Sequence, residues 1–251
     1  MKKGRIDVYL VAGGKYHDID FARLELLKLL HADERFRVRV GEDYRDIEAI
    51  RAADFLMTYT CDVVPTESEL AGLKAFLADG KRWFALHGTN SILQFLKDGR
   101  VDSPDKAPEF MEILGTQFVA HPPICTYRVD VSDPDHALTR GIEPFEVEDE
   151  LYLSRDTGDY HLLLETHFEG KAPGFVVEDW VDDRPQPVLY LRSYGNGEVL
   201  YLTLGHCRGK YDLQSLGVEE YEPVERCSWQ YPIYYELLRR GIAWAAGDLE
   251  G

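Results

Sequence analysis

The first half of the chain alternates between two kinds of hydrophobic pattern. Short apolar runs, each bounded by glycine or charged residues, predict β-strands at residues 5–12, 36–40, 54–60 and 81–86. Apolar residues three and four positions apart predict helices at residues 19–31, 44–52 and 66–80. Repeated strand and helix units joined by short loops are typical of a parallel sheet with helices on both faces.

Two of these helices carry recognisable start signals. Asp18 or Asp20 can cap the first helix, because a short carboxylate accepts hydrogen bonds from the free N–H groups of the first turn. Thr66 followed three residues later by Glu69 is a capping-box pattern. Both signals support the predicted helix boundaries.

The second half of the chain has strand character. Alternating or continuous apolar runs predict strands at residues 127–131, 161–165, 174–178, 188–192 and 199–204. The turn at residues 194–197 predicts a hairpin, and helices are expected at 108–114 and 230–246. The prediction is an α/β fold with a doubly wound, mostly parallel, flavodoxin-like sheet and a β-rich second half.

Length and charge limit the function classes. A chain of 251 residues with 45% hydrophobic content can bury a full core, and we expect one domain over residues 1–251. The formal net charge of −17 repels nucleic acids and anionic membranes. The arginines at 35, 37 and 39 alternate with apolar residues, as expected of a half-exposed strand rather than a basic patch.

The N-terminus and the cysteines bear on the cellular location. The basic start leads into a strand that contains Asp7, so it lacks the apolar region of a secretory signal peptide, and we expect a cytoplasmic protein. No apolar run approaches the length of about 18 residues that a membrane helix requires. The four cysteines are widely spaced, and we expect reduced thiols.

Histidines and small polar residues follow several predicted strands. His17 and Asp18 follow the first strand, His87 and Asn90 follow the fourth, and His206 follows the last. The carboxyl ends of parallel strands meet at one sheet edge, so these side chains are expected to converge there. The segment that ends in His87-Gly88 resembles the strand-to-helix turn on which α/β enzymes place reactive groups.

Carboxylate, phenol and further imidazole groups add to this chemistry. Glu150 and Tyr152 close an acidic run that also has a plain interpretation as a solvated loop. His87, His206 and Glu150 can form an acid and base group, or they can offer three ligands to a divalent metal. His121 lies in a predicted loop and is a further candidate for binding a substrate. A Cys207-His206 nucleophile pair is not expected, because neighbouring residues point in opposite directions.

The long segment of residues 208–226 is polar and acidic. Its length favours either a lid over the pocket or a plain surface excursion.

The order and spacing of several motifs resemble the ThuA-like family, named for trehalose utilisation, over nearly the whole chain. The matching segments lie at residues 13–18, 76–88, 114–122, 133–142, 149–152, 194–197 and 204–206. The resemblance implies a fold similar to class I glutamine amidotransferases. It places His87 at the amidotransferase nucleophile position, so thiol-dependent glutamine hydrolysis is not expected.

The resemblance also implies a role in carbohydrate metabolism. We expect an enzyme that acts by proton transfer on a sugar or oxidised sugar, as an isomerase, lyase or hydrolase. His87, His206 and Glu150 are the expected catalytic residues. The expected substrate-binding residues are His17, Asp18, Asn90, His121 and Tyr152.

Two alternatives stay open for the function. One is a non-catalytic sugar-binding or regulatory protein, and the other is a metal-dependent hydrolase. The expected partner is a small sugar or sugar derivative. The sequence leaves the oligomeric state open, with a homo-oligomer as one alternative, and it leaves the presence of a divalent metal open.

Overall fold

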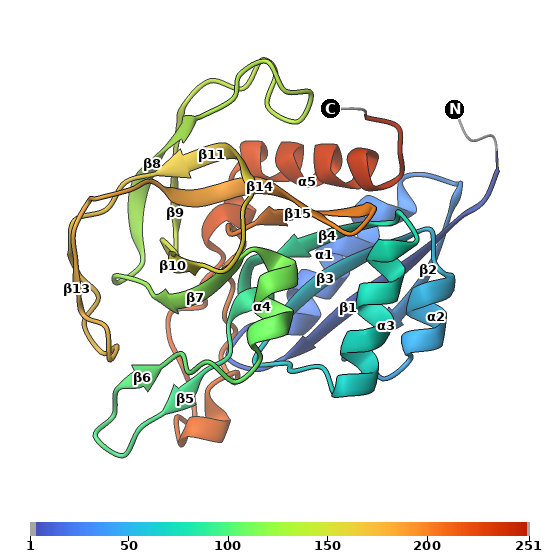
Figure 1. The fold of residues 1–251 in the computed structure, drawn as a ribbon. Helices are drawn as coiled ribbons and strands as arrows, with labels where there is room; N and C mark the ends of the chain where they lie inside the picture. The colour runs from blue at the N-terminus through green and yellow to red at the C-terminus, as the bar shows by residue number, and fades with distance from the viewer. Residues whose placement is uncertain (1–3, 250–251) are drawn as a thin grey trace.

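A nine-stranded sheet forms the centre of the protein in the computed structural model, which describes residues 4–249 (Figure 1). Across the sheet the strands follow the order β2-β1-β3-β4-β15-β14-β11-β8-β9. Their bounds are β1 Ile6–Gly14, β2 Phe36–Gly41, β3 Phe55–Cys61, β4 Arg82–Leu86, β8 Cys125–Val131, β9 Phe145–Asp149, β11 His161–Thr166, β14 Gln186–Tyr194 and β15 Gly197–Leu202.

The sheet is parallel on one side and antiparallel on the other. Strands β2, β1, β3, β4 and β15 run parallel to their neighbours, whereas the pairings from β15 through β14, β11 and β8 to β9 are antiparallel. The turn at Gly195-Asn196 joins β14 to β15, and so short a connection can join only antiparallel strands. The expected α/β class is confirmed, but the expected parallel arrangement is confirmed only for β2, β1, β3, β4 and β15.

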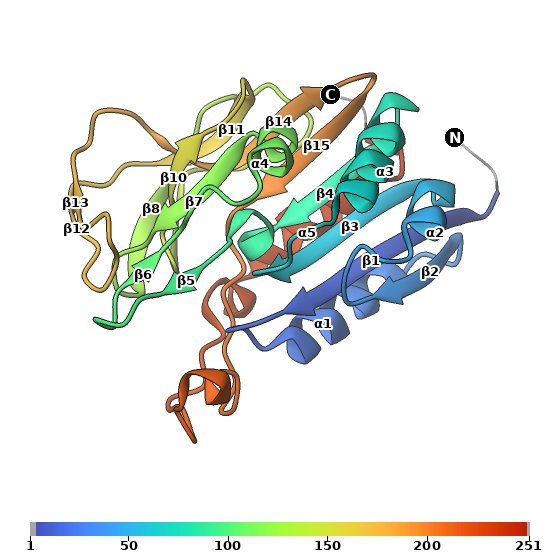
Figure 2. The same ribbon diagram turned by 60° about the horizontal axis from the view of Figure 1, so that its bottom comes forward.

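Helices cover both faces of the sheet, as expected for a doubly wound arrangement (Figure 2). Helices α1 (Ile19–His31) and α5 (Pro232–Ala245) bury Leu26 and Leu238 against one face. On the other face, Phe76 and Phe110 belong to the second hydrophobic cluster. The helices on that face are α2 Ile47–Ala52, α3 Glu67–Ala78 and α4 Pro108–Leu114.

The predicted helix caps are confirmed. The Asp18 carboxylate accepts a hydrogen bond from the backbone N–H of Phe21 at 3.1 Å. Thr66 and Glu69 form both hydrogen bonds of the capping box at the start of α3. Short polar side chains therefore set the first turn of α1 and α3, as the sequence indicated.

Three two-stranded ribbons lie beside the main sheet. Their strands are β5 Gln94–Phe95 with β6 Val101–Asp102, β7 Thr116–Ala120 with β10 Leu153–Asp156, and β12 Gly170–Lys171 with β13 Asp179–Trp180. The prediction of a strand at residues 174–178 is wrong, because these residues form a turn between β12 and β13. Only Phe175 is buried there, while Val176 and Val177 are exposed.

The carboxyl ends of β1, β3, β4 and β15 point toward the same edge of the sheet. The segments that leave these strands, including the short 3-10 helix η1 (His87–Asn90), therefore meet at this edge. Two further 3-10 helices, η2 (Gln214–Leu216) and η3 (Cys227–Gln230), follow β15. Among the described residues, none of the helices has the length and apolar character needed to cross a membrane.

Candidate functional site

Four buried side chains meet at the carboxyl edge of the sheet. His17 follows β1, His87 follows β4, Glu150 follows β9, and His206 follows β15. One nitrogen or carboxylate oxygen from each lies within 4.8 Å of those of the others. Their exposed fractions are 7%, 0%, 4% and 0%. The structure thus brings together the three expected catalytic residues and His17, in a group that could hold a metal ion.

The backbone at His87 explains how one imidazole reaches this point from a buried strand. His87 has a φ of +44°, in the left-handed region that costs a residue with a side chain about 1–2 kcal/mol. A Cβ at the next residue, Gly88, would lie 2.7 Å from the carbonyl oxygen of Thr60, so only glycine fits there. Such strain is typical of functional sites.

A buried carboxylate fixes the segments that carry Glu150 and His206. Asp149 accepts hydrogen bonds from the backbone N–H groups of Glu150 at 2.7 Å, Gly205 at 2.9 Å and His206 at 3.1 Å. Three backbone donors that would otherwise be buried without partners are thereby satisfied. Asp149 therefore joins the end of β9 to the segment that follows β15.

The inner contacts centre on His87 and Glu150. The Nε2 atoms of His17 and His87 are 2.9 Å apart, and the Tyr152 hydroxyl lies 3.1 Å from the same His87 nitrogen. Glu150 places one carboxylate oxygen 3.1 Å from Nδ1 of His206 and the other 3.6 Å from Nε2 of His87. Acid, base and hydrogen-bond donor groups therefore lie within contact distance of one another.

Burial and neighbouring charge set the protonation of these groups. Burial raises the pKa of Glu150, but the charges of His121 and His206 outweigh it and hold that pKa well below its usual range. Burial lowers the pKa of His206, yet Glu150 and Glu225 raise it to about 9. Burial and the two other histidines of the cluster hold the pKa of His17 well below its usual value, so this ring is neutral at pH 7.

Tyr152 remains a phenol at neutral pH. Burial and the charge of Glu150 both raise the pKa of its hydroxyl well above the usual value. Tyr152 can therefore donate a hydrogen bond to the cluster or to a ligand, in line with its expected role.

Two further charged residues, Arg208 and Glu225, contact the cluster, and the sequence did not indicate them. Glu225 lies 2.8 Å from Nε2 of His206 and 2.8 Å from the Arg208 guanidinium. Arg208 also lies 3.6 Å from Glu150. Both residues belong to the 208–226 segment, which has no motif or periodicity to mark them.

A cavity of about 290 Å³ lies above the cluster. His17, Glu150 and Tyr152 are among its lining residues, whereas His87 and His206 are not. Aromatic side chains from separate segments form much of its wall, which suits the flat faces of a sugar ring. The aromatic wall residues are Tyr16, Phe95, Phe118 and Phe175.

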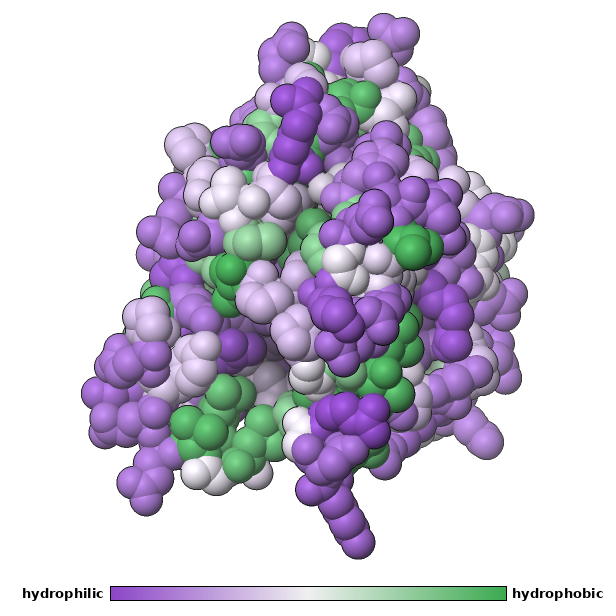
Figure 3. Space-filling model, turned by 90° about the vertical axis from the view of Figure 1, so that its left-hand side faces the viewer, coloured by the Kyte–Doolittle hydropathy of each residue, from purple (hydrophilic) through white to green (hydrophobic). Residues whose placement is uncertain are grey.

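The 208–226 segment contributes to this cavity. Its two ends pair through backbone hydrogen bonds between Arg208 and Glu225, and Leu213 and Leu216 line the cavity. In Figure 1 the segment lies at the lower end of the molecule, beside β5 and β6. Figure 3 shows hydrophobic side chains gathered at the lower end of this face, with smaller hydrophobic patches elsewhere among hydrophilic residues.

The other expected binding residues occupy different positions. His121 lines the cavity, with Nε2 3.4 Å from Glu150. Asp18 caps α1 and pairs with Arg226 at 2.8 Å, beside the cluster. Asn90 is buried away from the cavity wall, where its amide donates to the Thr116 hydroxyl at 2.8 Å. The structure thus brings His121 to the cavity and does not bring Asn90 there.

The cysteines give no sign of nucleophilic chemistry. All four are free, and burial raises the pKa of Cys207 to about 12. Its sulfur lies 3.2 Å from the Tyr59 hydroxyl, in the hydrophobic core. A thiolate is therefore not available at Cys207 near neutral pH.

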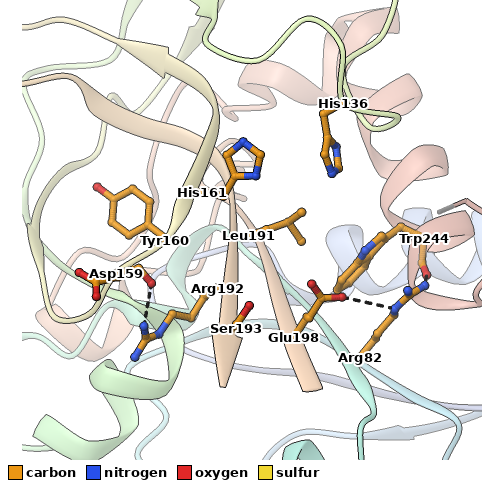
Figure 4. Close-up of a pocket in the computed structure, with 10 residues that line it drawn as sticks. All are labelled: Arg82, His136, Asp159, Tyr160, His161, Leu191, Arg192, Ser193, Glu198 and Trp244. Carbon is orange, nitrogen blue, oxygen red and sulfur yellow. Dashed lines mark hydrogen bonds and ion pairs between the residues drawn. The ribbon is translucent and has the colours of Figure 1, made fainter. Parts of the chain in front are cut away.

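A larger cleft of about 810 Å³ lies near the opposite, amino-terminal end of β4 and β15 (Figure 4). Its arginines already have partners, since Arg82 donates to the Trp244 carbonyl and Arg192 to the Asp159 carbonyl. His161, on its wall, pairs with Asp133 at 2.9 Å. The smaller cavity is the better candidate because several acid, base and donor groups converge there.

Comparisons with known proteins agree with this description of the fold. The sequence matches the family described as ThuA, trehalose utilisation, over residues 7–216. A putative ThuA-like protein from Bacteroides uniformis is 17% identical, with a TM-score of 0.66 over 100% of this chain and 95% of that one. A putative ThuA-like protein from Parabacteroides merdae is also 17% identical, with a TM-score of 0.65 over 98% and 92%.

A more distant likeness concerns a β-galactosidase from Rahnella sp. R3. It is 14% identical, with a TM-score of 0.53 over 80% of this chain and 29% of that one, which shows a shared fold alone. No match was found among curated proteins. The expected kinship with class I glutamine amidotransferases stays a prediction.

Proposed function

Because the chain belongs to the ThuA family, described as trehalose utilisation, we propose that it is an enzyme that acts by proton transfer on a sugar or oxidised sugar. The family membership supports a carbohydrate-related role. The observation that carries the catalytic part is the convergence of His17, His87, Glu150 and His206, two of which, His17 and Glu150, line an aromatic-walled cavity.

Each group in the cluster suits a distinct step. His17, which lines the cavity, is neutral at pH 7 and can accept a proton from a bound sugar, and the fully buried His87 lies behind it with its Nε2 2.9 Å from that of His17. Glu150 and His206 form an ion pair that can orient a hydroxyl or return a proton. The Tyr152 phenol can donate a hydrogen bond to an oxygen on which negative charge develops.

The cavity limits the substrate class. A volume of about 290 Å³ lies at the lower end of the usual range for small-molecule sites, which favours a ligand the size of one sugar unit. Aromatic walls with a polar inner end suit a ring that carries several hydroxyl groups. The proposed substrate is therefore a monosaccharide, its keto derivative, or one unit of a disaccharide.

The first test is a thermal-shift screen with mono- and disaccharides and their keto derivatives. A sugar at about 100 times its dissociation constant should stabilise the native state by roughly 2.7 kcal/mol. Sugars that shift the melt are then assayed for turnover. A carbohydrate role would be contradicted if every sugar left the melt unchanged, and saturable binding without product would favour the non-catalytic sugar-binding alternative.

The second test is His87→Asn, since asparagine tolerates a positive φ. Removing a general base should lower turnover about 10²- to 10⁴-fold while the melt stays close to that of the wild type. His161→Asn, at an exposed histidine, is the matched control. If His87→Asn melts far lower, Tyr152→Phe is the second variant, because it removes only the hydroxyl group and keeps the ring packing. A fall in kcat for Tyr152→Phe would then support a catalytic role of the cluster.

A further inference from the structure

His17 and His87 already use one ring nitrogen each as a hydrogen-bond donor. Nδ1 of His17 lies 3.2 Å from the carbonyl oxygen of Lys15, and Nδ1 of His87 lies 2.8 Å from that of Thr203. A carbonyl oxygen only accepts, so both Nδ1 atoms carry the proton. In the neutral rings, the two Nε2 atoms then carry a lone pair each and no proton. They face each other at 2.9 Å. Two lone pairs at this distance repel unless they share a cation.

His206 repeats this pattern. Its Nε2 lies 2.8 Å from the Glu225 carboxylate and donates to it. Its Nδ1 is buried without a hydrogen-bond partner, although a carboxylate oxygen of Glu150 lies 3.1 Å away in poor hydrogen-bond geometry. When a metal ion takes the place of the proton on this nitrogen, the nitrogen offers a third lone pair within 4.8 Å of the other two.

We propose that these four residues bind one divalent first-row transition-metal ion. The ligand atoms would be Nε2 of His17, Nε2 of His87, Nδ1 of His206 and a carboxylate oxygen of Glu150. Three imidazoles and one carboxylate are typical ligands of zinc, and iron, nickel and copper also accept imidazole.

The distances suit such an ion after small adjustments. With bonds of about 2.1 Å, a tetrahedral ion places its ligand atoms about 3.4 Å apart, whereas an octahedral ion places neighbouring ligand atoms about 3.0 Å and opposite ones about 4.2 Å apart. The separation between the His17 and His87 nitrogens is 2.9 Å, and the whole group fits within 4.8 Å. The most distant ligand atoms would have to approach each other by about 0.6 Å for an octahedral ion and by about 1.4 Å for a tetrahedral one.

The surroundings also match those of metal centres. Histidine ligands almost always donate their second ring N–H to a carbonyl or carboxylate, and all three histidines do so here. Glu150 and Glu225 supply two negative charges, which Arg208 and the proton on His206 offset. A divalent ion at the centre would take the place of that proton.

With their lone pairs on the ion, His17 and His87 would not serve as bases, and the ion would act instead as a Lewis acid toward a hydroxyl or carbonyl oxygen of a ligand in the cavity. This use of the metal rests on the function proposed above, whereas the binding itself does not. A test of binding therefore separates the two proposals.

The experiment uses the full chain, stripped of metals with a chelator and titrated with Co²⁺ alone. We expect one equivalent to bind, with a visible absorption band and a higher melting temperature, and Zn²⁺ to displace it. Elemental analysis should then give one zinc per chain. Absence of stoichiometric binding of Co²⁺ and Zn²⁺ by the wild type would overturn the proposal, even if sugars still bind.

Variants locate the ion. His17→Gln and His206→Gln should abolish stoichiometric Co²⁺ binding, whereas the exposed His161→Gln control should bind as the wild type does. Glu225→Gln, which acts through His206, should weaken binding about 10- to 100-fold and leave the stoichiometry at one. Unchanged binding by the folded His17→Gln or His206→Gln protein would place the ion elsewhere and contradict the proposal.

Discussion

At the scale of single residues, the buried carboxylate of Asp149 joins two segments that are 56 residues apart in the chain. It accepts hydrogen bonds from the backbone N–H groups of Glu150, Gly205 and His206. These bonds position a carboxylate and an imidazole of the cluster at the same time. Asp149 is thus a positioning residue for the candidate site.

Replacing Asp149 should therefore be costly. Asp149→Ala leaves three buried N–H groups without partners, and each costs about 1–3 kcal/mol, so we expect the free energy of unfolding to fall by about 3 kcal/mol or more. Urea denaturation measures this, and Glu148→Gln, at an exposed carboxyl group on the same strand, is the control. A loss of less than about 0.5 kcal/mol would contradict this account.

The residues of the site differ in how far the sequence could predict them. His17, His87 and His206 were predictable as neighbours because each follows a strand that ends at the same sheet edge. Arg208 and Glu225 were not, because they lie in a segment without hydrophobic periodicity. The catalytic and binding roles of the three histidines stay predictions.

At the scale of elements, periodicity predicted most strands of the main sheet, including the edge strand β2, but not the edge strand β9. The acidic run that contains β9 also allows an interpretation as a solvated loop, because Glu146 and Glu148 face solvent at the sheet edge while Val147 is buried. Charged residues protect such edges from pairing with other chains, and they also hide the strand in the sequence. Residues 174–178 gave the opposite error, because two exposed valines imitate a buried strand.

The contact between helix α5 and strand β4 permits a sharp test of packing. A Cβ at Gly241 would lie 2.3 Å from the Phe84 ring, so Gly241→Ala forces overpacking that costs about 1–3 kcal/mol. The gain in helix propensity is about 1 kcal/mol. We expect a lower melting temperature, with partial recovery when Phe84→Leu is added.

Gly4→Ala is the control for this prediction, because a Cβ at Gly4 would meet no atom within 4 Å. A Gly241→Ala variant that melts higher than the wild type would show that the helix can move away from the sheet at little cost.

At the scale of the whole molecule, one ion-pair group connects the loop between α1 and β2 to the segment that follows α5. Arg35 hydrogen-bonds Asp33, just after α1, at 3.0 Å and Asp248, just after α5, at 3.1 Å. Hydrogen bonds from Arg35 lower the pKa of both carboxyl groups. All three side chains are about one third exposed, so solvent screens part of this interaction.

The direction of these pKa shifts fixes a pH dependence. A carboxyl group whose pKa is lower in the folded than in the unfolded state stabilises the folded protein. This stabilisation is complete above the pKa that the group has in the unfolded state, and it is lost as pH falls through its pKa in the folded state. Arg35→Met should therefore destabilise the protein more at pH 7 than at about pH 3 in urea denaturation. Arg37→Met, whose Asp7 partner lies 3.9 Å away, is the control. A deficit that grows toward acid pH would contradict this assignment.

The walls of the cavity and its charged inner end belong to different parts of the architecture. The buried cluster follows the ends of sheet strands, whereas Phe95, Phe175 and Leu216 come from surface ribbons and a long loop outside the main sheet. Changes in those outer segments can reshape the cavity without disturbing the strand ends that hold the histidines. In such a scaffold, changes in the outer loops can alter which ligand the cavity accepts, while the buried histidine cluster stays the same.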